Sequence, residues 1–320
     1  MSVTIYGAGG FGINILTKLP KFVTEEGYSE FVRCGIDTSK SNLHENLKEE
    51  ETYLVEGTDG NGKKRNNNTE LLMESVNDIL LNHKPGDFNI VVHSASGGTG
   101  SVIGPLLVNE LIKRDALVFN VVIGSTSSRI ETENTLKTLK GYELTAKNTK
   151  KPIVTYYKEN NLNTPRGEID SHVVTTLTLL SIVLSGQNRE LDKTDIENFL
   201  HYTNVTEFVP KLVNMDFFSG SIDVKKGENV FTALTLTSKD GPTEIDGLVE
   251  YHALGYIPFN LEESYEGNLP IHLATIDGFF FKYVNGLQDK LKAFNEARVT
   301  VVDKSIVGEG DESATGNLIL

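Results

Sequence analysis

Through the first half of the chain, short and nearly continuous apolar runs alternate with segments in which apolar residues recur every third or fourth position. The runs are typical of buried parallel strands, and the second pattern is typical of helices that cover such a sheet. The expected strands are Ser2–Tyr6, Phe31–Ile36, Phe88–His93, Leu117–Ile123 and Pro152–Tyr156. The expected helices are Phe11–Leu19, Glu70–Leu81, Ser101–Lys113 and Glu131–Lys147. This alternation predicts an α/β fold with a mainly parallel sheet.

The middle of the chain holds one long apolar segment, Glu168–Ser185 (EIDSHVVTTLTLLSIVLS). It is apolar around most of a helical circumference, so we expect a long central helix buried between two layers, with Gly186 as its stop. Three later segments alternate like strands of a mixed sheet, and a helical pattern follows them. These strands are Val230–Thr237, Gly247–Ala253 and Ile271–Thr275, and the helix is Phe279–Arg298. The second half therefore predicts a smaller α+β domain.

These patterns suggest a division of the chain. Residues 1–165 form the first domain, residues 166–186 the central helix and residues 187–300 the second domain. Residues 301–320 form a tail, and Ser305–Leu320 (SIVGEGDESATGNLIL) is Gly-rich and acidic before it ends on apolar residues. This composition predicts that the tail is flexible.

The composition excludes several functions. Cys34 is the only cysteine, which rules out an internal disulfide and a cysteine-based zinc site, so we expect it to be a strand residue. The seven histidines show no metal-ligand spacing, and His93 and His172 are expected to be structural. A formal net charge of −14 and a pI near 5.0 argue against direct nucleic-acid binding, which needs clustered Lys and Arg.

The sequence also predicts a location. No run approaches the roughly 20 consecutive apolar residues of a membrane helix. The N-terminus passes directly into an apolar strand, without a basic and cleavable leader. We therefore expect a cytoplasmic protein that makes no membrane contact.

A glycine-rich turn, Gly7–Gly12 (GAGGFG), follows the first expected strand directly. Without side chains, the backbone amides of such a turn approach a phosphate at the N-terminus of the next helix, as in Rossmann-like sheets. This pattern equally suits a nicotinamide or flavin cofactor, with Asp37 at the end of the second strand as the ribose-binding acid. The first turn alone therefore leaves the ligand open.

A second turn, Ala95–Ser101 (ASGGTGS), lies between the strand ending near His93 and the next helix. A dinucleotide fold needs only one such loop, whereas two anion-binding turns around one site suit a nucleotide with several phosphates. The chain contains no GxxxxGK[ST] sequence, so this is not a Walker loop. The pair of turns favours a nucleoside polyphosphate.

These segments resemble the tubulin/FtsZ family. Ser96–Ser101 (SGGTGS) is similar to the tubulin signature GGGTGS, and Gly7–Asn14 (GAGGFGIN) is similar to the first glycine loop of FtsZ. Gly57–Arg65 (GTDGNGKKR) stands where FtsZ has its third loop. The resemblance covers residues 1 to about 200, and Ser96 and Val102 depart from it by replacing glycines of the signature.

The resemblance implies a GTP or GDP site with Mg²⁺ on the phosphates. Asp170 stands where relatives often use asparagine to contact guanine, and a carboxylate can accept from the N1–H and exocyclic amine of that base. Arg129 could reach a phosphate, although an exposed arginine is the better expectation. The expected nucleotide contacts are Gly9, Gly10, Phe11, Asn14, Asp37, Ser96, Gly97, Gly98, Thr99, Gly100, Ser101 and Asp170.

The resemblance also implies a catalytic loop after the central helix. Glu190–Asp195 is similar to the NxDxxD loop of FtsZ, with Asp192 and Asp195 retained and Glu190 in place of the asparagine. Two carboxylates three residues apart at a helix start can orient a water beside a γ-phosphate, but the same residues are common helix caps. Asn214–Ser219 begins similarly, but its sixth position is serine and it lies far from the central helix, so we reject it.

By resemblance, the chain assembles head to tail into a filament, with its acidic tail contacting a neighbouring copy. Phage relatives suggest that the filament positions phage DNA or capsids in the host bacterial cytoplasm, through the capsid or a DNA-bound adaptor as partner. Three alternatives stay open: a plasmid-segregation tubulin, an NAD(P)-dependent oxidoreductase built on Gly7–Gly12 and Asp37, and a binding module that does not hydrolyse its nucleotide.

Overall fold

A computed structural model shows how these segments fold. It describes residues 1–299 except 44–46, 59, 66–67, 162, 220–221, 223–227, 240, 242–247 and 263–270. The tail Ser305–Leu320, which we expect to be flexible, lies outside the described residues.

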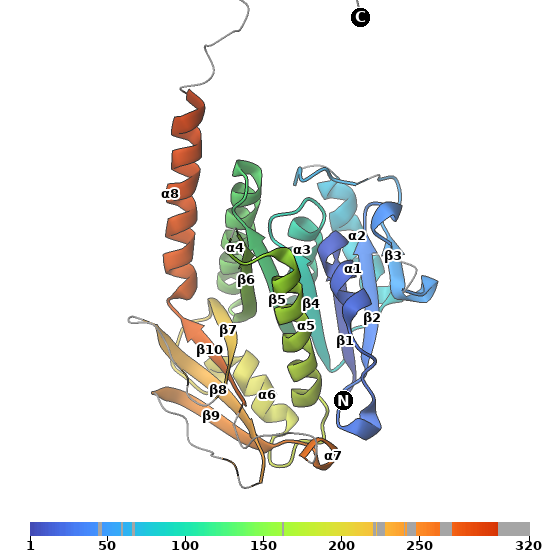
Figure 1. Cartoon of the computed structure of the whole chain (residues 1–320), viewed down its shortest axis with the longest axis vertical. Coiled ribbons are helices and arrows are strands. Elements are labelled where there is room, and N and C mark those ends of the chain that lie inside the picture. The colour runs from blue at the N-terminus through green and yellow to red at the C-terminus, as the bar shows by residue number, and fades with distance from the viewer. Residues whose placement is uncertain are drawn as a thin grey trace, which may run out of the picture.

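The strands form one continuous ten-stranded sheet with the order β3-β2-β1-β4-β5-β6-β7-β10-β8-β9 (Figure 1). The seven strands from β3 to β7 in this order run parallel, β10 is antiparallel to both of its neighbours, and β8 pairs with β9 in parallel. Their bounds are β1 Val3–Ala8, β2 Phe31–Asp37, β3 Thr52–Leu54, β4 Phe88–Ser94, β5 Leu117–Ser125, β6 Ile153–Asn160, β7 Leu212–Ser219, β8 Asn229–Thr237, β9 Val249–Tyr256 and β10 Ile271–Asp277.

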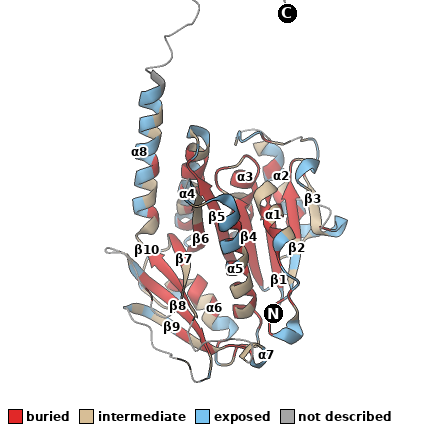
Figure 2. Cartoon of the chain, in the orientation of Figure 1, coloured by how far each residue is buried: buried red, intermediate tan, exposed pale blue. Residues whose placement is uncertain are grey.

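Helices cover both faces of this sheet. One apolar cluster packs α1, α5 and α6 on one face, and a second packs α2, α3, α4 and α8 on the other. The strands between them are buried along most of their length, as Figure 2 shows. The helix bounds are α1 Gly9–Lys18, α2 Thr69–Asn82, α3 Gly100–Lys113, α4 Arg129–Thr149, α5 Arg166–Val183, α6 Lys193–Leu200, α7 Phe259–Glu262 and α8 Phe279–Val299.

The expected central helix is α5. Its residues Ile169, Val173, Leu177 and Leu180 recur every three or four positions and are buried in the cluster that also contains strands of both halves of the chain. The α/β class, the mainly parallel sheet and the long central helix are thus confirmed. The mixed strands are not a detached sheet, because β7 pairs with β6 from Ile153↔Leu212 to Tyr156↔Met215. The domain limits at residues 165 and 186 stay a prediction.

Several elements differ from the sequence expectations. The short strand β3 and the strand β7 are additions, and β7 contains Asn214 and Asp216 of the segment that we reject as a catalytic loop. Cys34 is buried in β2, as expected. Among the described helices, none is both long and apolar enough to cross a membrane.

Candidate functional site

The two glycine-rich turns lie together at the carboxyl edge of the sheet. Strands β1 and β4 pair in parallel with Ala8 opposite His93, so α1 and α3 begin side by side after them. A Cβ atom added to Gly9 would lie 2.8 Å from the backbone nitrogen of Gly100, which shows that the turns are in contact. Gly9 also has a φ of +74°, which favours glycine.

These turns form the walls of a polar cleft of about 190 Å³. The first amides of α1 and α3 have no acceptor within their own helices, and the positive ends of both helix dipoles lie at this cleft. Backbone amides can therefore bind phosphates here without many positively charged side chains. The lining residues are Ala8, Gly9, Gly10, Phe11, Asp37, Asn42, Asn61, Gly62, Lys63, Ser94, Gly97, Gly98, Thr99 and Gly100.

Side chains brace the second turn from behind. The Ser101 hydroxyl donates to the Gly97 carbonyl at 2.6 Å, and Asn134 Nδ2 donates to the Ser96 and Gly97 carbonyls at 3.1 and 3.3 Å. The Thr99 hydroxyl lies 2.7 Å from that of Thr38. These contacts engage carbonyls of the turn, and the Ser96 N–H donates to Ser94 Oγ at 3.2 Å, so the amides of Gly97–Gly100 are the ones that can bind an anion. Ser96 and Ser101 are thus buried braces of the cleft and do not line it.

Asp37 lines the cleft but is engaged by its own loop. Its Oδ1 accepts from the backbone N–H of Thr38 at 2.6 Å, and its Oδ2 accepts from Asn42 Nδ2 at 2.8 Å. The side chain of Asn42 in turn lies about 3.1 Å from where a Cβ atom of Gly10 would stand. Both carboxylate oxygens therefore position this loop over the first turn, which disfavours the role of ribose-binding acid.

The third loop, within Gly57–Arg65, also reaches the cleft. Asn61 is buried there, and Lys63 forms an ion pair of 2.6 Å with Glu131. Partial burial alone would raise the pKa of Glu131, but its hydrogen bond and charge interaction with Lys63 lower it. Asn42, Asn61 and Lys63 were not among the contacts expected from the sequence. The glycine spacing of residues 57–65 was the signal that could have identified the last two.

A second polar group lies along α1, away from its first turn. Asn14 Nδ2 donates to Asp170 Oδ2 at 3.0 Å, and Lys18 Nζ lies 2.6 Å from the same oxygen. Asn14 and Asp170, both expected nucleotide contacts, are therefore neighbours across α1 and α5. Lys18 was not expected from the sequence.

The expected catalytic pair, Asp192 and Asp195, lies near the amino ends of β1 and β4, opposite the cleft. Lys193, next to Asp192, forms an ion pair of 2.9 Å with Asp87, which directly precedes β4. A backbone hydrogen bond from Ser2, just before β1, lowers the pKa of Asp87. A six-residue strand spans roughly 20 Å, so the start of α6 stands at the opposite end of β1 and β4 from the starts of α1 and α3, which wall the cleft. Figure 1 shows α6 at the lower end of the parallel strands.

Both acids cap α6. Asp192 Oδ1 accepts from the backbone N–H groups of Thr194 and Asp195 at 2.7 and 3.1 Å, and Asp195 Oδ2 accepts from the Asp192 N–H at 3.0 Å. The Tyr251 hydroxyl donates to Asp195 Oδ1 at 2.9 Å, and the pKa of Tyr251 is raised, chiefly by burial. Within one chain, Asp192 and Asp195 thus act as helix caps, which is the alternative to catalysis given in the sequence analysis. Asp192 remains exposed and Asp195 half-buried, so another molecule can reach both.

Other residues considered from the sequence lie outside the cleft lining. Arg129 begins α4 and bonds Asn295 at 3.1 Å and Glu133 at 3.4 Å. His93 is buried under the second turn with Nε2 2.6 Å from the Tyr142 hydroxyl, and burial lowers the pKa of His93 to about 4. Within the described part of the chain, no group of three or more His, Cys, Asp and Glu residues could hold a metal ion.

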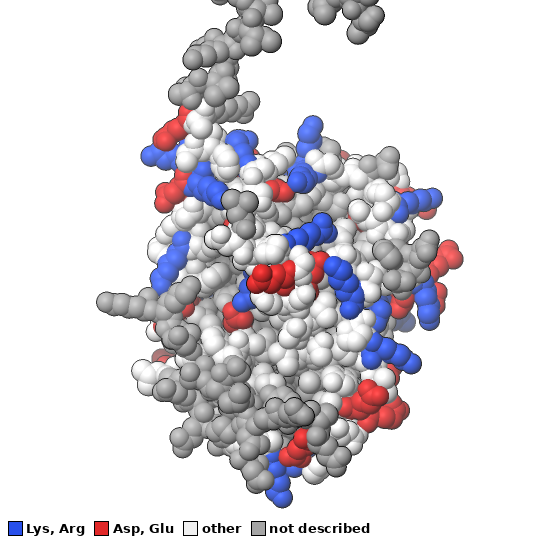
Figure 3. Space-filling view, in the orientation of Figure 1, with Lys and Arg blue, Asp and Glu red and all other residues white. Residues whose placement is uncertain are grey.

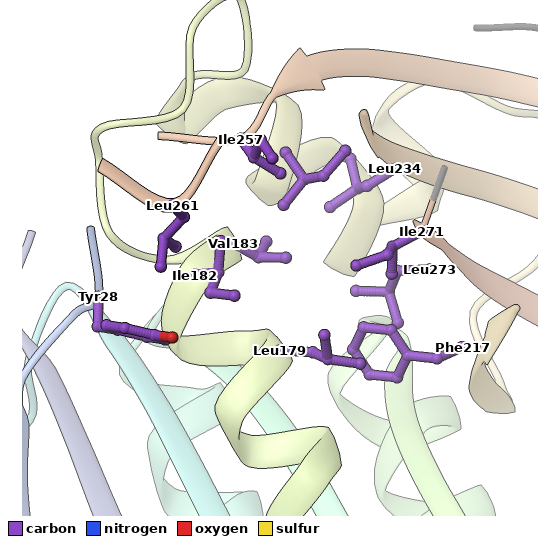
Figure 4. A pocket seen from close by; sticks show the side chains of 11 residues that line it. Tyr28, Leu179, Ile182, Val183, Phe217, Leu234, Ile257, Leu261, Ile271 and Leu273 are labelled. Atoms are coloured by element: carbon purple, nitrogen blue, oxygen red, sulfur yellow. The ribbon is translucent and has the colours of Figure 1, made fainter. Parts of the chain in front are cut away.

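A different cavity, of about 180 Å³, lies between the end of α5 and the mixed strands (Figure 4). Leu179, Ile182, Phe217, Leu234 and Leu273 point into it from α5, β7, β8 and β10. This lining offers a phosphate neither amides nor cations. The polar cleft is therefore the better nucleotide site.

The fold and the cleft define a class: an α/β nucleotide-binding protein whose phosphate site is shared by two glycine-rich turns. Residues 2–149 match the Tubulin/FtsZ family, GTPase domain. This match confirms, over residues 2–149, the resemblance to the tubulin/FtsZ family stated from the sequence.

The chain is also similar to individual phage proteins. It is 33% identical over 210 residues to a phage tubulin-like protein of Pseudomonas phage phiKZ, with 62% of each chain covered. It is 33% identical over 199 residues to a phage tubulin-like protein of Pseudomonas phage PhiPA3, with 62% of this chain and 61% of the relative covered. The chain thus spans a little under two thirds of the length of these two relatives.

Solved structures cover more of the chain. A protofilament of TubZ from bacteriophage PhiKZ has a TM-score of 0.82 at 25% identity, with 96% of each chain covered. The GDP complex of the phage tubulin PhuZ has a TM-score of 0.85 at 21% identity, with 97% of this chain and 96% of that chain covered. At that identity, the second likeness shows the fold alone.

Proposed function

We propose that the chain is a GTP-dependent, polymerising cytoskeletal protein that hydrolyses GTP where successive subunits meet. The observation that carries this proposal is the position of the polar cleft and of Asp192 and Asp195 at opposite ends of β1 and β4. In a head-to-tail stack, the acidic edge of one copy faces the cleft of the next. One subunit then supplies the phosphate site and its neighbour supplies the carboxylates.

In this proposal, the amides around Gly9–Phe11 and Gly97–Gly100 hold the phosphates, and Asn14 and Asp170 contact the guanine. The neighbour's acids orient a water for in-line attack on the γ-phosphorus, and one of them accepts the water's proton. The bond from the γ-phosphorus to the bridging oxygen breaks, which leaves GDP and phosphate. Loss of the phosphate weakens the contact between subunits.

Mg²⁺ belongs to the proposal because phosphate charge must be neutralised during transfer. Asp37 is the only carboxylate among the described residues that line the cleft, and it accepts from Thr38 and Asn42. This donor set fits a cation held mainly by phosphate oxygens and water, as Mg²⁺ prefers.

The names of the relatives suggest the biological role. A phage tubulin would form filaments that position phage DNA or capsids in the host bacterial cytoplasm, through a capsid or a DNA-bound adaptor. The acidic tail, outside the described residues, would contact a neighbouring subunit. Direct nucleic-acid binding is not part of this role: on the face in Figure 3, described basic and acidic side chains are interspersed. Plasmid segregation is the alternative role for the same filament.

Two measurements test the proposal. A nucleotide that binds the folded state stabilises it by about 2.7 kcal/mol at a concentration of 100 times Kd. This stabilisation raises the unfolding temperature. We expect this stabilisation with GTP and not with NADH, whereas the reverse result would support an oxidoreductase. We also expect sedimentation of the protein with GTP and not without it. Binding without sedimentation or turnover would indicate a simple binding module.

A further inference from the structure

The two carboxylate oxygens of Asp170 have unequal surroundings. Asp170 lies in the first turns of α5 and is buried. Its Oδ2 is 2.6 Å from Lys18 Nζ and 3.0 Å from Asn14 Nδ2. Its Oδ1 is also buried, and it accepts no hydrogen bond from the described residues. A buried acceptor without a donor is unusual in a folded protein, and a donor on a bound molecule would satisfy it.

The position of this oxygen relates it to the polar cleft. Phe11, Asn14 and Lys18 are three and four residues apart, so they share one face of α1. Phe11 lines the cleft at the first turn of α1, and Asn14 stands roughly 7 Å further along the helix axis than Gly9. Asp170, which contacts Asn14, therefore lies beyond the cleft on the face of α1 that carries Phe11, where the ribose and base of a nucleotide could extend from phosphates bound in the cleft.

The chemistry of Oδ1 selects among bases. An ionised carboxylate only accepts hydrogen bonds. Guanine and hypoxanthine both carry a proton on N1, whereas N1 of adenine is an acceptor and is repelled by a carboxylate oxygen. Lys18 and Asn14 both already contact Oδ2. Only Oδ1 is left, and it can satisfy N1–H without requiring the 2-amino group of guanine.

We propose that Lys18 is a specificity-determining residue of the base site, which rests on the proposed function. By engaging Oδ2, it leaves Asp170 with a single free oxygen, Oδ1, as the acceptor for a base. The site then selects purines that carry a proton on N1 and is nearly indifferent to the 2-amino group. Lys18 acts through Asp170 and is a positioning residue, while its own side chain is 44% exposed.

Competition binding with GTP, ITP and ATP tests this role at protein concentrations too low for assembly. For the wild type we expect similar dissociation constants for GTP and ITP, and binding of ATP weaker by roughly 100-fold or more. Lys18→Met removes the charge at similar length and should weaken GTP and ITP by about tenfold while ATP changes little. Lys18→Arg should restore the preference, and Lys21→Met removes an exposed charge nearby as the matched control.

Two results would overturn the role of Lys18. One is an unchanged ratio of GTP affinity to ATP affinity in Lys18→Met, which includes an equal loss of affinity for all three nucleotides. The ion pair between Lys18 and Asp170 would then only hold α1 against α5. The other is strong rejection of ITP by the wild type, because Asp170 would then use both oxygens. The second result needs no variant, so it holds even if Lys18→Met fails to fold. A wild type that binds none of the three nucleotides, or prefers ATP, would instead contradict the proposed function.

Discussion

The two ends of β1 and β4 are built in different ways. At the carboxyl end, the cleft depends on contacts between distant parts of the chain, such as Asn134 on Ser96 and Thr38 on Thr99. At the amino end, Asp192 and Asp195 hold each other in a capping box closed within four residues. The binding end therefore depends on long-range contacts throughout, while the acidic end is organised chiefly by the start of one helix, with Tyr251 as a long-range donor to Asp195. In the proposed function, neither end is a complete active site, and a second copy supplies the missing half.

The acidic end should show the largest effect. Asp195→Ala removes one of the two proposed catalytic carboxylates and should lower GTP turnover by roughly 10²–10⁴-fold, with nucleotide binding and filament formation retained. It also weakens the cap of α6, at about 1 kcal/mol of folding free energy. Asp195→Asn is the matched control, because an amide oxygen can still cap the helix but cannot take a proton. Phosphate release measured on sedimented filaments distinguishes these effects, and normal turnover in Asp195→Ala would refute the assignment.

At the cleft, a single methyl group should be enough to prevent binding. Gly9→Ala places a Cβ atom 2.8 Å from the Gly100 nitrogen at a φ of +74°, so the two turns must separate. We expect GTP affinity to fall by roughly 100-fold, since small misplacements at such sites have effects of this size. Gly141→Ala is the control, because a Cβ atom there meets no atom within 4 Å. Equal GTP affinity of the two variants in a binding titration would contradict the close contact of the turns.

Acid should loosen the cleft end through His93. Burial lowers the pKa of His93 to about 4, below its value in the unfolded chain, so the unfolded state binds the extra proton between these two values. The free energy of unfolding should therefore decrease as the pH is lowered through this range. His93 alone should contribute a decrease of roughly 2 kcal/mol between pH 7 and pH 5. Denaturant titrations of the wild type and His93→Gln isolate the contribution, because other buried histidines are present in both. Identical pH dependence of the two proteins would count against it.

The smallest effect should come from Arg129. It lies at the start of α4 but bonds Glu133 and Asn295 instead of the cleft residues. Arg129→Ala should change stability by about 0.5 kcal/mol or less, as exposed ion pairs do, and leave GTP affinity unaltered. A tenfold loss of affinity in the same titration would show that this arginine reaches the nucleotide.

The sequence predicted the parts of this comparison that depend on local pattern. Gly9 and Gly97–Gly100 are visible because clustered glycines directly after a strand indicate a tight turn or a close backbone approach, and α5 is visible from its apolar circumference. Asn42 was missed because only the folded chain brings its loop to the cleft, whereas Lys63 lies in the glycine-rich loop 57–65, whose spacing could have identified it. Strand β7 was missed because Asn214 and Asp216 interrupt its apolar pattern, and Asp216 is accommodated by an ion pair of 2.8 Å with Lys158 of the adjacent β6. Without β7, the continuity of the two sheets could not be predicted.

Mixing two defective proteins tests the shared site most directly. Gly9→Ala should lack a working cleft and Asp195→Ala should lack one of the two proposed catalytic carboxylates, so each alone should hydrolyse little GTP. In a mixture, the intact cleft of an Asp195→Ala subunit can meet the intact acids of a Gly9→Ala subunit. We predict that the mixture releases phosphate much faster than the sum of the two separate rates. A rate equal to that sum would show that the acids do not act on a neighbour's nucleotide.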